Sequence, residues 1–193
     1  GQGYIQTTPL QLCLMTAQLA NGGFKIYPKI TINEKDKTAI EIKELMNEGE
    51  DFIKSINEDQ YTKLFDKKEN IELIRNSMFA STNEIRGTSY SSRIEDPKYQ
   101  FAGKTGTSQV KRITEDEREL DLATKDIDYK NRDHALFIAF GPFKNPRYAL
   151  SIVIEHGGSG SSVAAPLAKE LFKLIIDRHN LREQAQTQKI INT

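Results

Sequence analysis

Four consecutive residues near the middle of the chain, Lys104-Thr105-Gly106-Thr107, combine groups that suit a bound carboxylate. The lysine ammonium and the two threonine hydroxyls can all donate hydrogen bonds to an anion. Gly106 carries no side chain, so a substrate backbone can lie close to the chain there. In a strand at a sheet edge, the Thr107 N–H is also available to a developing oxyanion. The four residues predict a carboxylate and oxyanion site, although alone they leave open a glycine-containing strand with surface threonines.

This tetrapeptide lies in the first of three predicted strands, residues 101–110, where its threonines should share one face and its lysine the other. The second and third strands, 134–140 and 148–155, are rich in aliphatic and aromatic residues. Lys144-Asn145-Pro146-Arg147 is typical of a hairpin turn, which predicts that the last two strands are antiparallel. The charge-mixed segment 111–133 is expected to be a solvated connector or a partner-facing loop.

The first predicted helix begins after Thr8, because Gln11 stands three residues later in the spacing of a capping box. It ends at Asn21-Gly22-Gly23, where glycine permits the left-handed conformation. Cys13 within this helix is expected to be a small buried hydrophobe. The apolar stripe predicted to face the core consists of Leu10, Leu14, Met15 and Ala17.

Two further helices are predicted from apolar spacing, at residues 55–83 and 162–179. Short strands are expected at Lys25–Tyr27 and Lys29–Ile32, with Pro28 favouring an edge position. A polar connector then runs to about residue 51.

Composition and charge exclude several classes of protein. The chain has 193 residues, with 27 basic and 27 acidic side chains and a net charge of zero, so it lacks the basic field of a nucleic-acid binder. Its apolar runs are shorter than a membrane span requires, and a single cysteine cannot form an internal disulfide. His134 and His156 lack metal-site spacing, so we expect structural roles at strand ends and no metal.

Five motifs resemble those of class B penicillin-binding proteins, and they occur in the family's order. The K-T-G-T tetrapeptide belongs to a signature set that also includes S-x-x-K and S-x-N motifs. The Gly-Gln-Gly-Tyr opening and the Gly-Gly-Ser-Gly run look more like family members of cell elongation than septal members. The five motifs are Gly1–Tyr4 running into Thr8–Leu12, Arg86–Ser89, Lys104–Thr107, His134–Pro142 and Glu155–Pro166.

The resemblance implies an α+β fold, an antiparallel sheet flanked by helices that matches the C-terminal portion of the penicillin-recognising fold. It implies a serine-type peptidoglycan D,D-transpeptidase that acts on stem peptides ending in D-alanyl-D-alanine, is a β-lactam target and needs no cofactor. By the resemblance, Lys104 supplies positive potential and orients the S-x-N serine. Thr105 and Thr107 would bind the substrate carboxylate beside Gly106, and the Thr107 N–H would form half of the oxyanion hole.

In the family, the nucleophilic serine of S-x-x-K and the S-x-N motif both precede the segment that resembles Gly1–Tyr4. We therefore expect residues 1–181 to be the C-terminal part of a transpeptidase domain, followed by a polar tail at 182–193, and the chain alone to be inactive. Three segments match the missing motifs in residue types, and we reject all three. Ser108–Lys111 continues the Lys104 strand, whereas the family's nucleophile starts a helix across the cleft, and Ser55–Asn57 and Ser81–Asn83 lie after that opening, in the wrong order.

The resemblance also predicts where such a protein works and with which partners. The parent protein would be anchored at the periplasmic face of the bacterial inner membrane, within the cell-elongation machinery. An isolated fragment would leave one sheet face and one strand edge uncovered, which predicts an oligomer. Two alternatives stay open: a non-catalytic penicillin-recognising sensor module, and an unrelated structural α+β domain in which K-T-G-T is coincidental.

Overall fold

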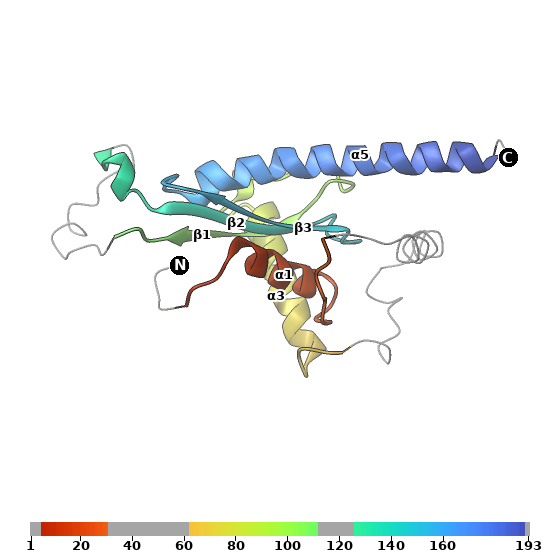
Figure 1. The fold of residues 1–193 in the computed structure, drawn as a ribbon, viewed down its shortest axis with the longest axis horizontal. Helices are drawn as coiled ribbons and strands as arrows, with labels where there is room; N and C mark the ends of the chain where they lie inside the picture. Colours follow the sequence, from red (N-terminus) through yellow and green to blue (C-terminus); the bar gives the residue numbers. More distant parts are fainter. Residues whose placement is uncertain (1–4, 31–61, 112–125, 192–193) are drawn as a thin grey trace.

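A computed structural model describes residues 5–30, 62–111 and 126–191 of the chain. Within these ranges, one antiparallel sheet has the strand order β1-β2-β3 (Figure 1). Its strands are β1 (Ala102–Ser108), β2 (His134–Gly141) and β3 (Tyr148–Ile154). The three strands predicted at 101–110, 134–140 and 148–155, the antiparallel hairpin and the α+β class are confirmed. β2 lies in the centre of the sheet, with Ile138 opposite Lys104 of β1.

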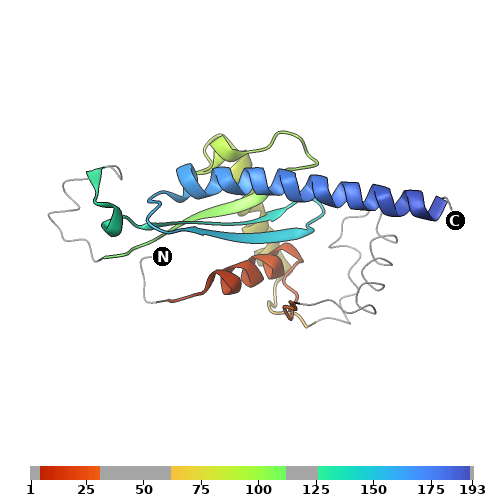
Figure 2. The ribbon, with the colours of Figure 1, turned by 45° about the horizontal axis from the view of Figure 1, so that its top comes forward.

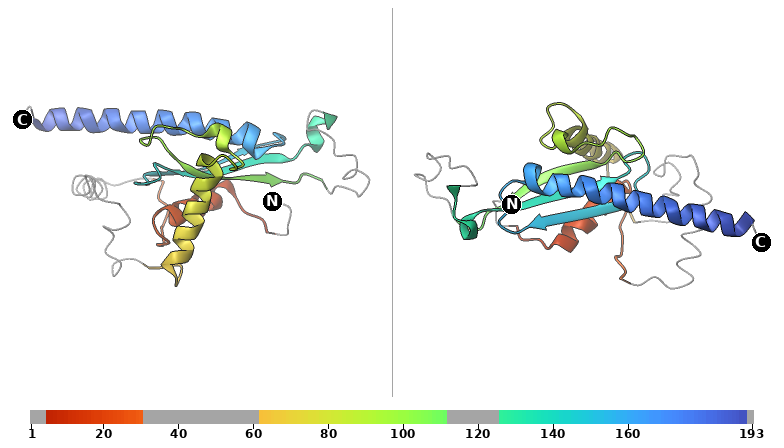
Figure 3. Two further views of the ribbon diagram at one scale, coloured as in Figure 1. Left: turned by 180° about the vertical axis from the view of Figure 1, so that it is seen from behind. Right: turned by 90° about the horizontal axis from the view of Figure 1, so that it is seen from above.

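Helices cover both faces of this sheet. α5 (Ala165–Ile191) runs along one face, and α1 (Pro9–Ala20) lies against the other (Figure 2). α3 (Lys68–Asn83) contacts α1 and packs on β1, beside which it crosses the edge of the sheet (Figure 3). The short elements are the 3-10 turns η2 (Tyr90–Ser92) and η4 (Tyr129–Asn131) and the π-helical turn η5 (Gly160–Ala164).

The two sheet faces bury separate apolar clusters. On the α5 face, Phe101, Phe137 and Phe172 are fully buried, and the rings of Phe101 and Phe172 stack with centroids 5.0 Å apart. On the α1 face, Phe140 packs in a cluster with Ile71 of α3. Phe137 and Phe140 serve opposite faces because side chains alternate along a strand.

α1 begins where the sequence predicts it. Thr8 Oγ1 accepts from the Gln11 N–H at 3.2 Å, and Gln11 Oε1 accepts from the Thr8 N–H at 2.8 Å, which confirms the capping box. The predicted apolar stripe is wrong in part, because Leu10 and Met15 are exposed whereas Thr16 is buried. Thr16 tolerates burial because its hydroxyl donates to the carbonyl one helical turn earlier, at 2.7 Å.

Of the second predicted helix, residues 55–83, the structure describes residues 62–83, and the part at 62–67 is not helical. α3 begins at Lys68, where the preceding residue has an extended backbone, and it ends at Asn83 as expected. Leu64 and Phe65 have the spacing of helical residues but lie outside the helix and are exposed. Their spacing alone did not distinguish a helix from the irregular segment that leads into it.

The strand predicted at Lys25–Tyr27 does not form in this described part of the chain. The preceding residue, Phe24, instead makes an isolated antiparallel bridge with Lys63. Several predicted features lie outside the described residues: the opening Gly1–Tyr4, the end of the strand at Lys29–Ile32, the polar connector to residue 51, Ser55–Asn57 and most of the connector 111–133.

The C-terminal helix is longer than the predicted 162–179. It starts with η5 and continues as α5 to Ile191, so the predicted end near His179 is wrong. Glu183, one turn beyond His179, contacts Arg147 Nη1 at 2.6 Å and His179 Nε2 at 2.8 Å. These contacts tie the far part of the helix to the hairpin before β3.

Candidate active site

The K-T-G-T residues occupy the middle of β1, and the backbone of this strand presents donors at its outer edge. The Phe101 carbonyl accepts from the side-chain amide at the end of α3 at 2.9 Å, and the Gly103 N–H donates to Thr82 Oγ1 at 3.1 Å. These backbone groups therefore point away from β2. Because the direction of backbone groups alternates along a strand, the N–H groups of Thr105 and Thr107 point off the same edge.

Lys104 and Thr105 meet at this edge even though neighbouring side chains leave opposite faces of a strand. Lys104 is exposed, and its Nζ donates to the Thr105 carbonyl at 2.9 Å and to Thr105 Oγ1 at 3.3 Å. Thr105, Gly106 and Thr107 are half-buried. The edge thus brings an ammonium beside a hydroxyl and two outward N–H groups, all of which can donate to an anion.

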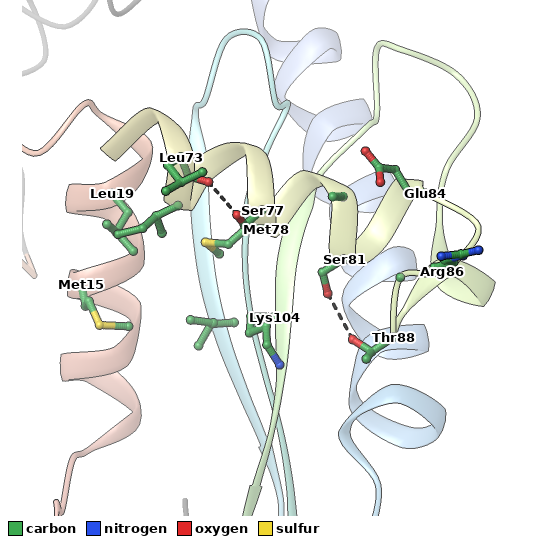
Figure 4. Close-up of a pocket in the computed structure, with 14 residues that line it drawn as sticks. Met15, Leu19, Leu73, Ser77, Met78, Ser81, Glu84, Arg86, Thr88 and Lys104 are labelled. Carbon is green, nitrogen blue, oxygen red and sulfur yellow. Dashed lines mark hydrogen bonds between the residues drawn. The ribbon is translucent and has the colours of Figure 1, made fainter. Parts of the chain in front are cut away.

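Lys104 also lines a pocket of about 670 Å³ between α1, α3 and β1 (Figure 4). In Figure 4, Lys104 lies between an apolar end and a polar end, and Ser81, Thr88, Arg86 and Glu84 belong to the polar end. An apolar wall beside a cation suits a ligand with an apolar body and an anionic group. The apolar wall consists of Met15, Leu19, Leu73, Ile74, Met78 and Ile138.

Two hydroxyls outside the tetrapeptide extend its polar contacts. Ser81 Oγ lies 3.1 Å from Thr88 Oγ1, and Thr88 Oγ1 lies 3.4 Å from Thr105 Oγ1. The sequence named Thr88 within the Arg86–Ser89 motif and Ser81 as a rejected motif match, and it assigned neither residue a role in the site. Their contact with Thr105 could not be predicted, because the three side chains come from a helix, a loop and a strand.

Gly160 supports β1 from the α5 side. A Cβ at this position would lie 2.5 Å from the Leu136 carbonyl oxygen and 2.7 Å from the Gly106 carbonyl oxygen. Only glycine lets η5 approach the strand backbones this closely. The Gly-Gly-Ser-Gly run therefore helps to hold the K-T-G-T strand.

The two histidines and the cysteine have structural surroundings. His134 Nδ1 accepts from the His156 N–H at 2.9 Å, and His156 Nδ1 lies 3.1 Å from the Arg132 carbonyl, which fits the predicted roles at strand ends. Cys13 is half-buried, its Sγ lies 3.4 Å from the Ala149 carbonyl, and burial raises the pKa of its thiol. Among the described residues, no three His, Cys, Asp or Glu side chains come together as a metal site.

The sequence matches the penicillin binding protein transpeptidase domain over residues 1–173. This chain therefore belongs to that family, which excludes the alternative of an unrelated structural domain. It is similar to the peptidoglycan D,D-transpeptidase MrdA of Salmonella typhimurium, with 30% identity over 179 residues that cover 92% of this chain and 26% of that protein. The chain thus spans about a quarter of the length of this curated relative.

Two solved structures are similar to the fold described above. One is PBP2 of Helicobacter pylori in complex with MreC, with a TM-score of 0.61 and 29% identity over 90% of this chain and 26% of that one. The other is PBP2 of Pseudomonas aeruginosa in complex with WCK 5153, with a TM-score of 0.60 and 32% identity over 90% of this chain and 31% of that one. The predicted resemblance to class B penicillin-binding proteins is confirmed, and both similar structures are of penicillin-binding protein 2. In the described parts of the chain, no helix is long and apolar enough to cross a membrane.

Proposed function

We propose that this chain supplies the substrate-binding strand of a peptidoglycan D,D-transpeptidase that cross-links stem peptides during cell-wall elongation. The observation that carries the proposal is the outer edge of β1, where the Lys104 ammonium lies beside the Thr105 hydroxyl and the backbone N–H groups point outward. The curated relatives, which carry the name of this enzyme class, support the same reaction.

Each residue of the tetrapeptide has a role in this proposal. Thr105 and Thr107 donate their hydroxyl hydrogens to the carboxylate of a D-alanyl-D-alanine end or of a β-lactam, and Lys104 supplies the positive charge beside them. Lys104 also orients the serine of the S-x-N motif. Gly106 lets the substrate backbone approach the strand. The Thr107 N–H stabilises the oxyanion that forms when the substrate carbonyl is attacked, and the nucleophilic serine supplies the second N–H.

The proposal assigns residues 1–181 to the C-terminal part of a transpeptidase domain and residues 182–193 to a polar tail. It places the nucleophilic serine on a preceding segment that is not among these residues. The coverage of about a quarter of the Salmonella relative is compatible with that arrangement. The chain alone would recognise a carboxylate weakly and would form no acyl-enzyme, because the covalent route needs the serine.

Intact-mass spectrometry after incubation with benzylpenicillin tests this proposal. We expect no stoichiometric acyl adduct on the 193-residue chain and one adduct on the complete polypeptide that carries it. An adduct on the chain alone would show that the nucleophile lies within it. Failure of the complete polypeptide to react would overturn the assignment as a penicillin-binding transpeptidase.

The same proposal names the ligands and surroundings. Its ligands are stem peptides and β-lactams, and the parent protein works at the periplasmic face of the bacterial inner membrane with the cell-elongation machinery. The PBP2 structures in complex with WCK 5153 and with MreC support a ligand-binding domain that belongs to a larger assembly. Association of the isolated chain through its β1 edge stays a prediction.

A further inference from the structure

Three hydroxyl groups form a continuous line from α3 to the K-T-G-T strand. Ser81 Oγ lies 3.1 Å from Thr88 Oγ1, the contact drawn in Figure 4, and Thr88 Oγ1 lies 3.4 Å from Thr105 Oγ1. At the far end of the line, Lys104 Nζ lies 3.3 Å from the same Thr105 oxygen. Two residues outside the tetrapeptide are thus connected to the hydroxyl that the proposed function assigns to the substrate carboxylate.

The lysine gives this line a direction. A lysine ammonium can only donate, so the Thr105 oxygen accepts from Lys104 and its own O–H is left to donate elsewhere. Thr88 Oγ1 is the acceptor in reach, and Ser81 Oγ is in turn in reach of the Thr88 O–H. In this ligand-free arrangement, the hydrogens point from Lys104 toward Ser81.

A bound carboxylate would reverse that direction. An ionised carboxylate only accepts, so the Thr105 O–H has to turn from Thr88 toward the ligand. Thr88 can then donate to Thr105 Oγ1, and Ser81 can donate to Thr88 Oγ1, by rotation of their hydroxyls alone. Hydrogen bonds in such a chain polarise one another, so this support would strengthen the donation from Thr105 to the anion.

The loop that carries Thr88 is held firmly against the end of α3. A Cβ at Gly87 would lie 2.3 Å from the Ser81 carbonyl oxygen, so only glycine fits there. On the other side of Thr88, the buried Ser89 donates to the same carbonyl from its N–H and from its hydroxyl, each at 3.0 Å. Thr88 is exposed but lies between two fixed neighbours, so its hydroxyl has a defined place over Ser81.

We propose that Thr88 is a positioning residue for the Thr105 hydroxyl, with Ser81 as the next member of the line, and that together they set how strongly the site prefers a ligand carboxylate. The inference rests on the proposed function, because it concerns the same carboxylate site. It adds two residues, from the end of α3 and from the loop before η2, that act on the carboxylate through the Thr105 hydroxyl.

The test compares acylation of the complete polypeptide by benzylpenicillin and by its methyl ester, which lacks the charge. The readout is the ratio of the two second-order acylation rates. Removal of one hydroxyl in Thr88→Val should lower this ratio about threefold to tenfold, the range for one lost hydrogen bond. Thr88→Ser, which keeps the hydroxyl, should retain the original ratio, and Ser81→Ala should lower it by a smaller factor.

A double-mutant cycle separates positioning from a general structural role. If Thr88 acts through Thr105, Thr88→Val should leave the ratio unchanged within about twofold when Thr105→Val is already present. Thr187→Val is the matched control, because Thr187 is an exposed threonine of α5 whose hydroxyl donates to a helix carbonyl at 2.9 Å, away from the site.

The outcomes distinguish the two proposals. No preference for the charged penicillin in the unmodified protein would overturn the carboxylate site and, with it, the present inference. A clear preference that Thr88→Val leaves unchanged would overturn only the role of Thr88. An equal loss of both rates, or additive effects with Thr105→Val, would also overturn that role, since either result is what a structural contribution produces.

Discussion

The α5 face of the sheet and the outer edge of β1 are held by opposite kinds of contact. Toward α5, the sheet buries Phe101 and Phe137 completely against Phe172, with rings in stacked and edge-on contact. At the outer edge, hydrogen bonds from α3 satisfy the backbone only as far as Gly103, and half-buried or exposed polar residues follow. The apolar core thus begins at Phe101, the residue before β1, and the candidate site follows within β1 itself.

This contrast determines which substitutions can be interpreted as effects on ligand binding. The α5 face owes its stability to buried aromatic surface, whereas polar residues near the surface contribute little to stability. Substitutions at the β1 edge should therefore alter ligand recognition and leave the free energy of unfolding unchanged. Substitutions at the α5 face should lower the free energy of unfolding. The predictions below test that separation.

The largest effect is expected from Phe172→Ala in α5. The side chain is fully buried and packs on Phe101, so its loss should lower the free energy of unfolding by about 3–5 kcal/mol. Urea denaturation of the 193-residue chain measures this change. Leu174→Ala is the matched control on the same helix, because Leu174 is 65% exposed, and it should change stability by less than about 0.5 kcal/mol. Similar losses for the two variants would contradict an apolar core on this face.

A large effect on reaction but not on folding is expected from Thr107→Val. Hydrogen bonds to charged groups are worth about 1.5–3 kcal/mol, so the rate of acylation of the complete polypeptide by benzylpenicillin should fall about tenfold to a hundredfold. The free energy of unfolding should stay within about 0.5 kcal/mol. Thr107→Ser keeps the hydroxyl and serves as the control. An unchanged acylation rate in Thr107→Val would show that Thr107 is not part of the site. A loss of stability would show that the β1 edge contributes to folding as well as to recognition.

Sequence patterns predicted the elements around the site because those elements depend on neighbours in the chain. The capping box at Thr8 sets the start of α1, and strand-forming residues with a hairpin turn between them set β2 and β3. The K-T-G-T tetrapeptide was recognised by its residue types, whereas its position at the sheet edge is a finding of the structure, where the strand order is β1-β2-β3.

The features that sequence patterns missed depend on contacts between distant segments. Thr16 can be buried because its hydroxyl donates a hydrogen bond within the helix. A prediction from the spacing of apolar residues leaves out such a polar residue. Gly87 and Gly160 are required by close backbone approaches to Ser81 and Leu136, and such approaches exist only after folding. The link between Thr88 and Thr105 depends on the first of these approaches, so no spacing rule could have found it.

The smallest effect is expected at the end of α5 that extends beyond the sheet. Like the β1 edge, this part of the helix depends on polar contacts. Partial burial acts to raise the pKa of Glu183, but hydrogen bonds from Arg147 and His179 outweigh it and hold that pKa below its ordinary value of 4.5. A lowered pKa in the folded state means that the ionised carboxylate stabilises this contact above about pH 4.5, and that the stabilisation is lost as the pH falls further.

Because this ion pair lies near the surface, it is worth at most about 1 kcal/mol. Glu183→Gln should therefore loosen the end of α5 slightly at pH 7, and its Cα chemical shifts over residues 184–191 should report less helix than the unmodified chain. As the pH falls through the lowered pKa of Glu183, which itself lies below 4.5, the two proteins should converge, since the unmodified carboxylate becomes protonated there. Glu170→Gln, an exposed change on the same helix, should produce neither effect. Identical shifts for Glu183→Gln and the unmodified chain at pH 7 would show that the end of α5 does not depend on the contacts of Glu183 with Arg147 and His179.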